Sequence, residues 1–203
     1  MHNRLFMVIA VCVAATIGAW PAWAAAQVAQ GSSVSSGGAI STEVPNELLP
    51  YGSDWVAKGS GALRFFGFKA YDATLWVTSA QTPFSFSKPF ALDIRYATSV
   101  KAKDISNTSL IELQRISTSS PEQIAAWSAF MDSVFVDVKA GDRLTGVHLP
   151  SAGVRFFHNG KLIGESPDTA FSEAFFKIWV DPKTKRKDLR NALLAIPSET
   201  RSQ

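Results

Sequence analysis

Residues 141–165 read GDRLTGVHLPSAGVRFFHNGKLIGE, and this stretch decides the fold. Asn159-Gly160 has strand-forming residues on both sides, Phe156 and Phe157 before it and Leu162 and Ile163 after it. Asn and Gly best tolerate the positive φ angles that a type I′ turn needs at both central positions. We therefore predict a strand over residues 142–149 and a hairpin over residues 154–164, with turns at 141–142 and 150–153.

The two histidines of this stretch, His148 and His158, have two interpretations. They are ordinary strand residues, His158 being the last residue before the turn, or they are a pair of metal ligands. A metal pair needs further ligands at suitable spacing, and the sequence beyond residue 24 has neither a cysteine nor an HxxxH arrangement to supply them. We therefore predict no metal site, and the absence of a P-loop and of a dinucleotide fingerprint predicts no bound cofactor. The sequence also lacks a GxSxG motif for a nucleophilic serine.

Strands are expected in blocks on both sides of a helical segment. Residues 54–66 and 68–78 are predicted as strands around Gly67, and residues 88–98 alternate apolar and polar side chains as a half-buried strand does. A helix is predicted over residues 101–116. The next helix begins with Ser120 as N-cap, Pro121 at its first position and Gln123 completing a capping box.

The C-terminal part is predicted to be helical. Ser166-Pro167-Asp168 begins a third helix by the same capping logic, and its apolar side chains recur at helical spacing: Phe171, Ala174, Phe175, Ile178 and Trp179. A last helix carries Leu189, Ala192, Leu193 and Ile196. Because strands and helices come in separate blocks, we predict an α+β domain, in which an antiparallel sheet has helices packed on one face.

The N-terminus has the pattern of a cleavable signal peptide. Arg4 precedes an apolar run over residues 5–17 that is too short to span a bilayer, and Ala22-Trp23-Ala24 places small residues where signal peptidase reads. We predict cleavage after Ala24, with a second site after Ala26, and export to the periplasm. A retained membrane anchor is the alternative. The single cysteine, Cys12, follows Val11, which disfavours a lipid attachment site.

Composition divides the rest into a linker, one domain and a tail. Residues 25–50 are rich in Ala, Gln, Ser and Gly and are predicted to be a flexible linker, followed by a domain over 51–197 and a tail over 198–203. The formal net charge of +3 is too weak to indicate a nucleic-acid partner. We interpret the densest basic run as a solvated helix start rather than a phosphate or membrane patch: Lys183, Lys185, Arg186, Lys187 and Arg190.

Four stretches in this order resemble the chalcone isomerase-like family, in particular its bacterial secreted branch. They are GSGALRFFGFKAYDATLWV (59–77), KPFALDIRY (88–96), the segment 138–165 and DTAFSEAFFKIWVDP (168–182). The resemblance covers residues 51–196. It implies an open-faced β-sandwich, a curved antiparallel sheet backed by helices. The family includes enzymes that close chalcones to flavanones, fatty-acid-binding relatives and members with no known activity.

The resemblance points to Arg64 and Tyr71 as ligand-binding residues. Arg64 follows Gly59-Ser60-Gly61, where the family has an arginine, and Tyr71 stands where the enzymes have a ketone-side hydroxyl and the fatty-acid binders a carboxylate-holding tyrosine. If Gly67-Phe68 forms a two-residue turn, the side chains of Arg64 and Tyr71 lie opposite each other on one face of the sheet. In that register Leu63 and Phe65 point away from this face. The structural alternatives are a surface strand residue for Arg64 and a core aromatic for Tyr71.

The catalytic set of the family's enzymes is incomplete in this chain. The enzymes carry a second tyrosine and a lysine on the helix after the third strand. Here SVKAKDISNTSLIELQRIS (99–117) has Lys101 and Lys103 at its start and no tyrosine. We therefore assign no catalytic residue, and the leading hypothesis is a non-catalytic binder of a small amphipathic ligand such as a fatty acid. An intramolecular lyase of the chalcone isomerase type and an interaction or assembly module are the alternatives.

Overall fold

The computed structural model describes residues 43–79 and 83–197, which belong to a compact unit that begins at Ala39. The predicted signal peptide (1–24), most of the predicted linker (25–50) and the predicted tail (198–203) lie outside the described residues. The first element, the 3₁₀ helix η1 (Asn46–Tyr51), precedes the predicted domain start at residue 51, and Glu47 and Leu48 are buried in it. The packed domain therefore extends into the segment that composition assigned to the linker.

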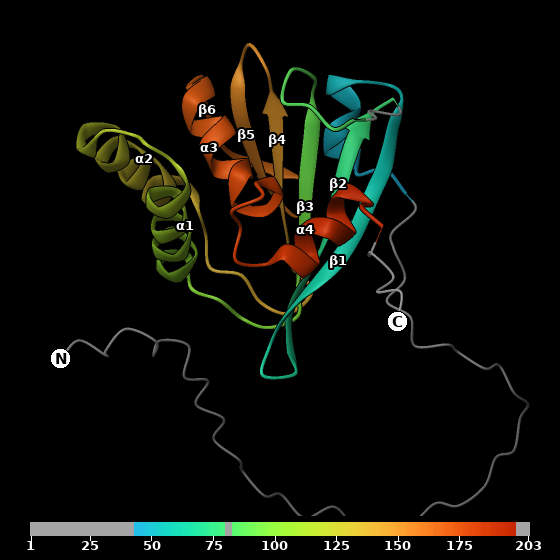
Figure 1. Ribbon diagram of the computed structural model, residues 1–203, viewed down its shortest axis with the longest axis horizontal. Helices are drawn as coiled ribbons and strands as arrows, with labels where there is room; N and C mark the ends of the chain where they lie inside the picture. Colours follow the sequence, from blue (N-terminus) through green and yellow to red (C-terminus); the bar gives the residue numbers. More distant parts are fainter. Residues whose placement is uncertain (1–42, 80–82, 198–203) are drawn as a thin grey trace, which may run out of the picture. The chain divides into compact units, whose positions relative to one another are not determined.

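The core of the domain is a six-stranded antiparallel sheet whose strands are paired in chain order (Figure 1). Its strands are β1 (Trp55–Phe65), β2 (Phe68–Thr78), β3 (Phe90–Tyr96), β4 (Arg143–Leu149), β5 (Gly153–His158) and β6 (Lys161–Ser166). The first four strands lie within predicted segments, whereas β5 begins one residue before the predicted hairpin and β6 ends two residues after it. The predicted α+β class is confirmed. Two helices separate β3 from β4 in the chain, yet these two strands pair directly.

The turn between β5 and β6 confirms the Asn159-Gly160 prediction. The φ angles are 51° at Asn159 and 82° at Gly160, as both central positions of a type I′ turn require. The Asn159 side chain also holds the neighbouring strand, because its Oδ1 accepts a hydrogen bond of 2.8 Å from the backbone N–H of Arg143. The turn thus fixes the edge hairpin against β4.

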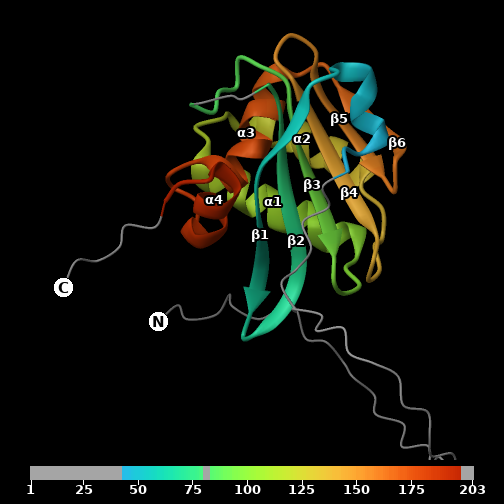
Figure 2. The ribbon, with the colours of Figure 1, turned by 90° about the vertical axis from the view of Figure 1, so that its right-hand side faces the viewer.

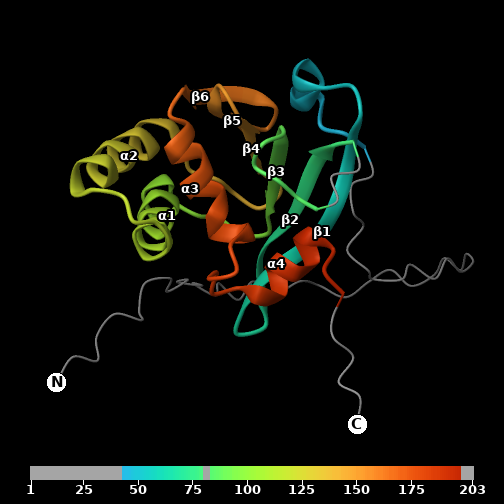
Figure 3. The same ribbon diagram turned by 45° about the horizontal axis from the view of Figure 1, so that its top comes forward.

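Four helices lie on one side of the sheet, with η1 on the other side (Figure 3). They are α1 (Ala102–Ile116), α2 (Pro121–Val134), α3 (Thr169–Val180) and α4 (Lys187–Leu194). The Ser120–Gln123 capping box is confirmed. The predicted N-cap of α3, Ser166, is wrong. The N-cap is Asp168, whose carboxylate accepts a hydrogen bond of 2.9 Å from the backbone N–H of Phe171. The last helix ends at Leu194 and leaves Ile196 outside it.

η1 covers part of the face opposite the helices (Figure 2). Its Leu48 is fully buried there beside Trp55, Trp76 and other side chains of a second, smaller core. The Trp55 indole N–H donates to the backbone carbonyl of Leu48 at 2.9 Å, which fixes η1 against the first strand. Pro45 is the N-cap of this short helix and Pro50 lies inside it.

A buried polar cluster, formed by Glu47, Asp93, Arg143 and Thr145, lies on this same face. The Thr145 hydroxyl is 2.9 Å from Glu47 Oε1 and 2.8 Å from Asp93 Oδ1, although it has only one proton to donate. The Arg143 guanidinium forms an ion pair with each carboxyl group. Burial is the main cause that raises the pKa of Asp93, and a protonated Asp93 would supply the second hydrogen bond to Thr145. The cluster thus ties η1 to β3 and β4.

Candidate functional site

The space between the sheet and the helices is filled mainly by aromatic side chains. Phe90 is fully buried, its ring stacks on His148 with centroids 4.6 Å apart, and it meets Phe176 edge to face at 4.9 Å. Phe156, Phe171 and Phe175 extend this packing toward α2. A ligand that enters this layer therefore has to move aromatic side chains, and the site must be sought where polar groups reach it.

His148 and His158, the histidines of the quoted stretch, lie in different surroundings. His148 is buried, with Nε2 2.8 Å from the Phe86 carbonyl and Nδ1 2.8 Å from the Ser172 hydroxyl, and burial is the main cause that lowers its pKa. His158 lies at the other end of the sheet strands, 3.4 Å from Asp142. Across residues 43–79 and 83–197, no group of three His, Cys, Asp or Glu side chains is placed to hold a metal ion.

The hydroxyl of Tyr71 is a polar group at the aromatic layer. Its hydroxyl accepts a hydrogen bond of 3.0 Å from the indole N–H of Trp179 on α3, and its ring packs edge to face on Tyr96 with centroids 5.9 Å apart. Burial raises the pKa of Tyr71 to about 12, so the hydroxyl keeps its proton at neutral pH. Among the described residues, none accepts that proton in a hydrogen bond.

Tyr96 supplies a second hydroxyl of the same kind. It lies directly opposite Tyr71 in the β2–β3 register, and burial is the main cause that raises its pKa as well. Its hydroxyl has no hydrogen-bond partner in the part of the chain that the structure describes, and the ring is buried with only 8% of its surface exposed. Two protonated hydroxyls therefore lie on the helix-facing side of the sheet beside each other's rings.

The cation that acts on Tyr71 is Arg186, not Arg64. Arg186 precedes α4, and its positive charge lowers the pKa of Tyr71 against the larger effect of burial. Its guanidinium is held by the Asp188 carboxylate at 2.7 Å and donates to the backbone carbonyl of Arg64 at 2.9 Å. The sequence interpretation of Arg186 as part of a solvated helix start missed this position, which only the packing of α4 on β1 creates.

The predicted register of Arg64 and Tyr71 is wrong. The turn is at Phe66-Gly67 rather than Gly67-Phe68, and Ala70 is an extra residue in β2 without a partner in the ladder. Both changes place Leu63 opposite Tyr71 and Arg64 opposite Lys69. Neighbouring strand residues face opposite sides of a sheet, so Arg64 is exposed on the side away from Tyr71, while Leu63 enters the core.

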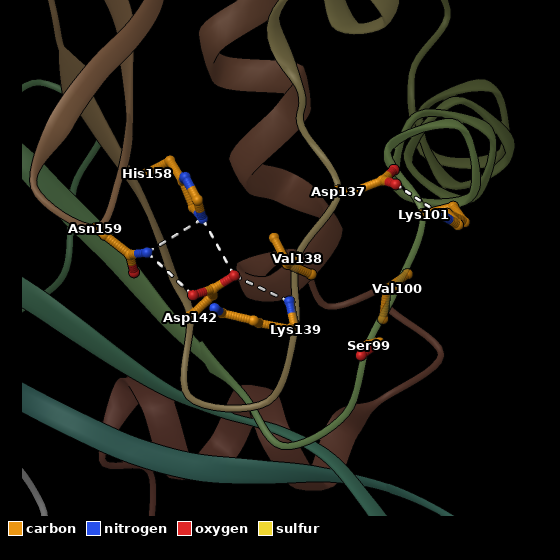
Figure 4. A pocket seen from close by; sticks show the side chains of 9 residues that line it. All are labelled: Ser99, Val100, Lys101, Asp137, Val138, Lys139, Asp142, His158 and Asn159. Atoms are coloured by element: carbon orange, nitrogen blue, oxygen red, sulfur yellow. Dashed lines mark hydrogen bonds and ion pairs between the residues drawn. The ribbon is translucent and has the colours of Figure 1, made fainter.

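An open depression of about 530 Å³ lies at the end of the sheet that holds the β5–β6 turn. Figure 4 shows the side chains that line it. They belong to Ser99, Val100, Lys101, Asp137, Val138, Lys139, Asp142, His158 and Asn159. Asp142 lies on one side of the depression, next to His158 and Asn159. Hydrogen bonds, above all the one from the Asn159 side chain, hold the pKa of the Asp142 carboxyl below its ordinary value. The same carboxyl lies 3.4 Å from His158 Nε2.

A family model described as chalcone isomerase-like matches residues 40–195. The chain belongs to the chalcone isomerase-like family. The match begins before η1, in agreement with the burial of Glu47 and Leu48. No curated protein sequence matches the chain.

The chalcone isomerase-like fold is also seen in a solved structure. The crystal structure of a fatty-acid-binding protein from Arabidopsis thaliana superposes with a TM-score of 0.54 at 9% identity, over 70% of this chain and 88% of that one. At this identity the likeness concerns the fold: an open, curved antiparallel sheet with helices on one side. The predicted architecture is confirmed.

The helix that carries a tyrosine and a lysine in the family's enzymes corresponds here to α1. Its two candidate lysines form surface ion pairs, Lys101 with Asp137 and Lys103 with Asp132, each at 2.7 Å. In this chalcone isomerase-like chain Tyr96 lies on β3, and Arg186 lies on the segment before α4. None of the described helices is both long and apolar enough to cross a membrane.

Proposed function

We propose that this domain is a non-catalytic binder of a small amphipathic ligand, such as a fatty acid, whose polar end is held at Tyr71. The observation that carries the proposal is the pair of protonated tyrosine hydroxyls, Tyr71 and Tyr96, whose protons no described residue accepts. They lie at the rim of an aromatic layer that suits an apolar chain. Arg186 supplies the positive charge that a carboxylate needs, and family membership supports this class of ligand.

Binding requires a rearrangement at Trp179. Its indole N–H donates a hydrogen bond to the Tyr71 hydroxyl, and its ring packs on Phe175 with centroids 5.4 Å apart. We propose that the ligand displaces this side chain, so that the polar end meets the hydroxyls and the apolar chain takes the space of the indole. Trp179 fluorescence should therefore report binding, and Trp179→Phe should remove the signal.

We expect a fatty-acid titration to rank the polar residues. Arg186→Gln removes a charge-assisted contact and should weaken binding by roughly 1.5–3 kcal/mol. Tyr71→Phe removes a neutral hydrogen bond and should weaken it by roughly 0.5–1.5 kcal/mol, less than additively with Arg186→Gln because both groups contact one carboxylate. Arg95→Gln is the matched control, since Arg95 precedes Tyr96 on β3 and is exposed.

Arg64 is included in the same titration as a separate variant. The resemblance predicts that Arg64 binds the carboxylate, whereas the register turns its side chain away from Tyr71. Arg64→Gln should weaken binding as much as Arg186→Gln in the first case and leave it unchanged in the second. A wild-type chain that binds no fatty acid would contradict the proposal itself.

An intramolecular lyase is the second candidate, because the two hydroxyls could also stabilise the oxyanion that develops on a ketone. Conversion of a 2′-hydroxychalcone, followed by absorbance and lost in Tyr71→Phe, would favour this reaction over simple binding. If the chain neither binds fatty acid nor converts chalcone, the remaining candidate is an interaction or assembly module.

We also propose that the protein acts in the periplasm. The arrangement of Arg4, the apolar run 5–17 and Ala22-Trp23-Ala24 supports export and cleavage. Sequencing of the N-terminus of the exported protein should give Ala25 as the first residue, or Gln27 if the second site is used. A product that keeps Met1 and stays in the membrane fraction would contradict this location.

A further inference from the structure

The tip of the β1–β2 hairpin, defined here as residues 65–68, extends beyond the rest of the domain (Figures 1 and 2). Its three phenylalanines are exposed: Phe65 by 49%, Phe66 by 101% and Phe68 by 81%. Phe66 and Phe68 are the most exposed large apolar side chains among the described residues. Isolated apolar residues on a surface are normal, but several gathered on one projecting point mark a contact site.

The backbone adds a second reason to look for a function at Phe66. Phe66 has a φ of 47° and Gly67 a φ of 84°, which are the angles of a type I′ turn. Asn159-Gly160 makes the same turn in this protein with the favoured residue, at 51° and 82°. A bulky side chain at positive φ is strained, and this one gains no packing in return. Neither local geometry nor burial therefore explains the phenylalanine.

The side chains behind the tip are arranged by depth. Phe66 and Gly67 are outermost, the Phe65–Phe68 pair follows, and the Arg64–Lys69 pair comes next. At about 3.3 Å per residue, the two cations lie roughly 7 Å behind the end of the hairpin. Lys69 is 2.7 Å from Asp72, and the Arg186 guanidinium lies over the Phe65 ring at 5.7 Å, beside Asp188. Aromatic rings in front of basic residues match the order of a bilayer surface.

We propose that this tip docks the protein onto a lipid bilayer, with the phenylalanine rings at the boundary of headgroups and acyl chains and with Arg64 and Lys69 at anionic headgroups. The depth of insertion, about 5–10 Å, is that of interfacial segments and needs no membrane-spanning helix. The proposal does not depend on the bound ligand, since the tip acts through its own side chains. It places Tyr71, on the same hairpin, close to the membrane surface.

Vesicle flotation tests the tip directly. The protein is a chain from Ala25, which keeps the whole compact unit from Ala39 and lacks Cys12. Vesicles are phosphatidylglycerol with phosphatidylethanolamine, or phosphatidylcholine alone. Wild type should bind both, and the anionic vesicles more tightly. Phe66→Asn should weaken partitioning by about tenfold or more, because one exposed ring is lost from the apolar phase.

Phe66→Asn separates function from folding. Asn suits positive φ better than Phe, so the variant should melt at the same temperature as wild type or higher while it loses vesicle binding. Ile111→Gln is the matched control, since Ile111 is an exposed apolar side chain (53%) on α1 and its loss should leave binding unchanged. Arg64→Gln with Lys69→Gln should weaken binding severalfold on anionic vesicles and little on phosphatidylcholine.

A fluorophore at position 66 gives an independent measurement. Since the chain from Ala25 has no cysteine, Phe66→Cys can carry a single environment-sensitive aromatic label, whose rings replace the lost phenyl ring, with Ala152→Cys in the β4–β5 loop as control. Emission should shift to the blue on vesicles for the first label only. If wild type does not bind vesicles that contain no other protein, the proposal is overturned, and the tip would then serve a protein partner. Equal vesicle binding by Phe66→Asn and wild type would overturn it as well.

Discussion

Replacing Arg143 by methionine is expected to lower the free energy of unfolding by about 3–5 kcal/mol, because the substitution leaves two buried carboxyl groups without their cation. The Glu47 side chain is only 3% exposed and that of Asp93 10%, so water cannot take the place of the guanidinium. Methionine fills a similar volume, which separates the loss of charge from the loss of packing. Urea unfolding followed by far-UV circular dichroism measures the difference.

Arg95→Met is the control, since Arg95 is the exposed partner of Arg143 in the β3–β4 register and should cost little. Adding Glu47→Gln to Arg143→Met should recover part of the lost stability, because it removes one uncompensated charge. A single variant as stable as wild type would show that the buried cluster does not need its cation.

The pH dependence of this cluster has a definite sign. Because the pKa of Asp93 is raised in the folded chain, folding takes up a proton in the window between the ordinary pKa of 3.8 and the raised value. In that window the contribution of Asp93 to stability grows as the pH falls and is lost as the pH rises. Because the Arg143 charge lowers the pKa of Asp93, Arg143→Met raises this pKa further. Acidification should therefore stabilise the variant more than wild type and narrow the difference between their free energies of unfolding.

Gly153→Ala is expected to lower the free energy of unfolding by about 3 kcal/mol, from two causes that act together. Gly153 has a φ of +80°, which costs about 1 kcal/mol for alanine. An added Cβ would also lie 2.0 Å from the backbone carbonyl oxygen of Ser166 and under 3 Å from the Pro167 backbone. No side-chain rotation relieves a contact with backbone, so β5 or the end of β6 must shift.

Gly160→Ala provides the comparison for this effect. Gly160 has a φ of +82°, but the nearest atom to an added Cβ is Glu47 Oε2 at 3.5 Å, an ordinary contact. It should therefore cost only about 1 kcal/mol. Thermal melts of both variants measure the two costs, and equal losses would refute the close approach of Gly153 to Ser166.

The strands and helices follow from local signals in the sequence. Alternation of side chains predicts β3, the Asn-Gly turn predicts the last hairpin, and Ser120 with Gln123 predicts the start of α2. These patterns are sufficient because each depends on neighbours within a few residues. η1 lacks such a pattern: its burial depends on Trp55 and Trp76, which reach Leu48 only in the folded sheet.

The candidate site was predictable only in part. Tyr71 is a residue that the family resemblance selects, but its neighbours come from β3, α3 and the segment before α4. The one-residue change of turn and the extra Ala70 together reverse the face of Arg64, and neither has a signal in LRFFGFKAY. Strand register has a period of two, so a shift of one residue exchanges the sides of every side chain. The tertiary packing of Arg186 had no local signal at all.

The pairing of β3 with β4 has a consequence for the chain entropy that is lost on folding. The other neighbouring strands are joined by at most eleven residues, those between β2 and β3, whereas residues 97–142 intervene between these two. The entropy lost on closing a loop grows with its length, by about 0.6 kcal/mol for each doubling. The chain therefore consists of two meanders, β1–β3 and β4–β6, and pairing β3 with β4 closes the longest connection between neighbouring strands, at the largest cost in chain entropy. Asp93 on β3 and Thr145 on β4 lie directly opposite each other, and their hydrogen bond stabilises the pairing of these two strands.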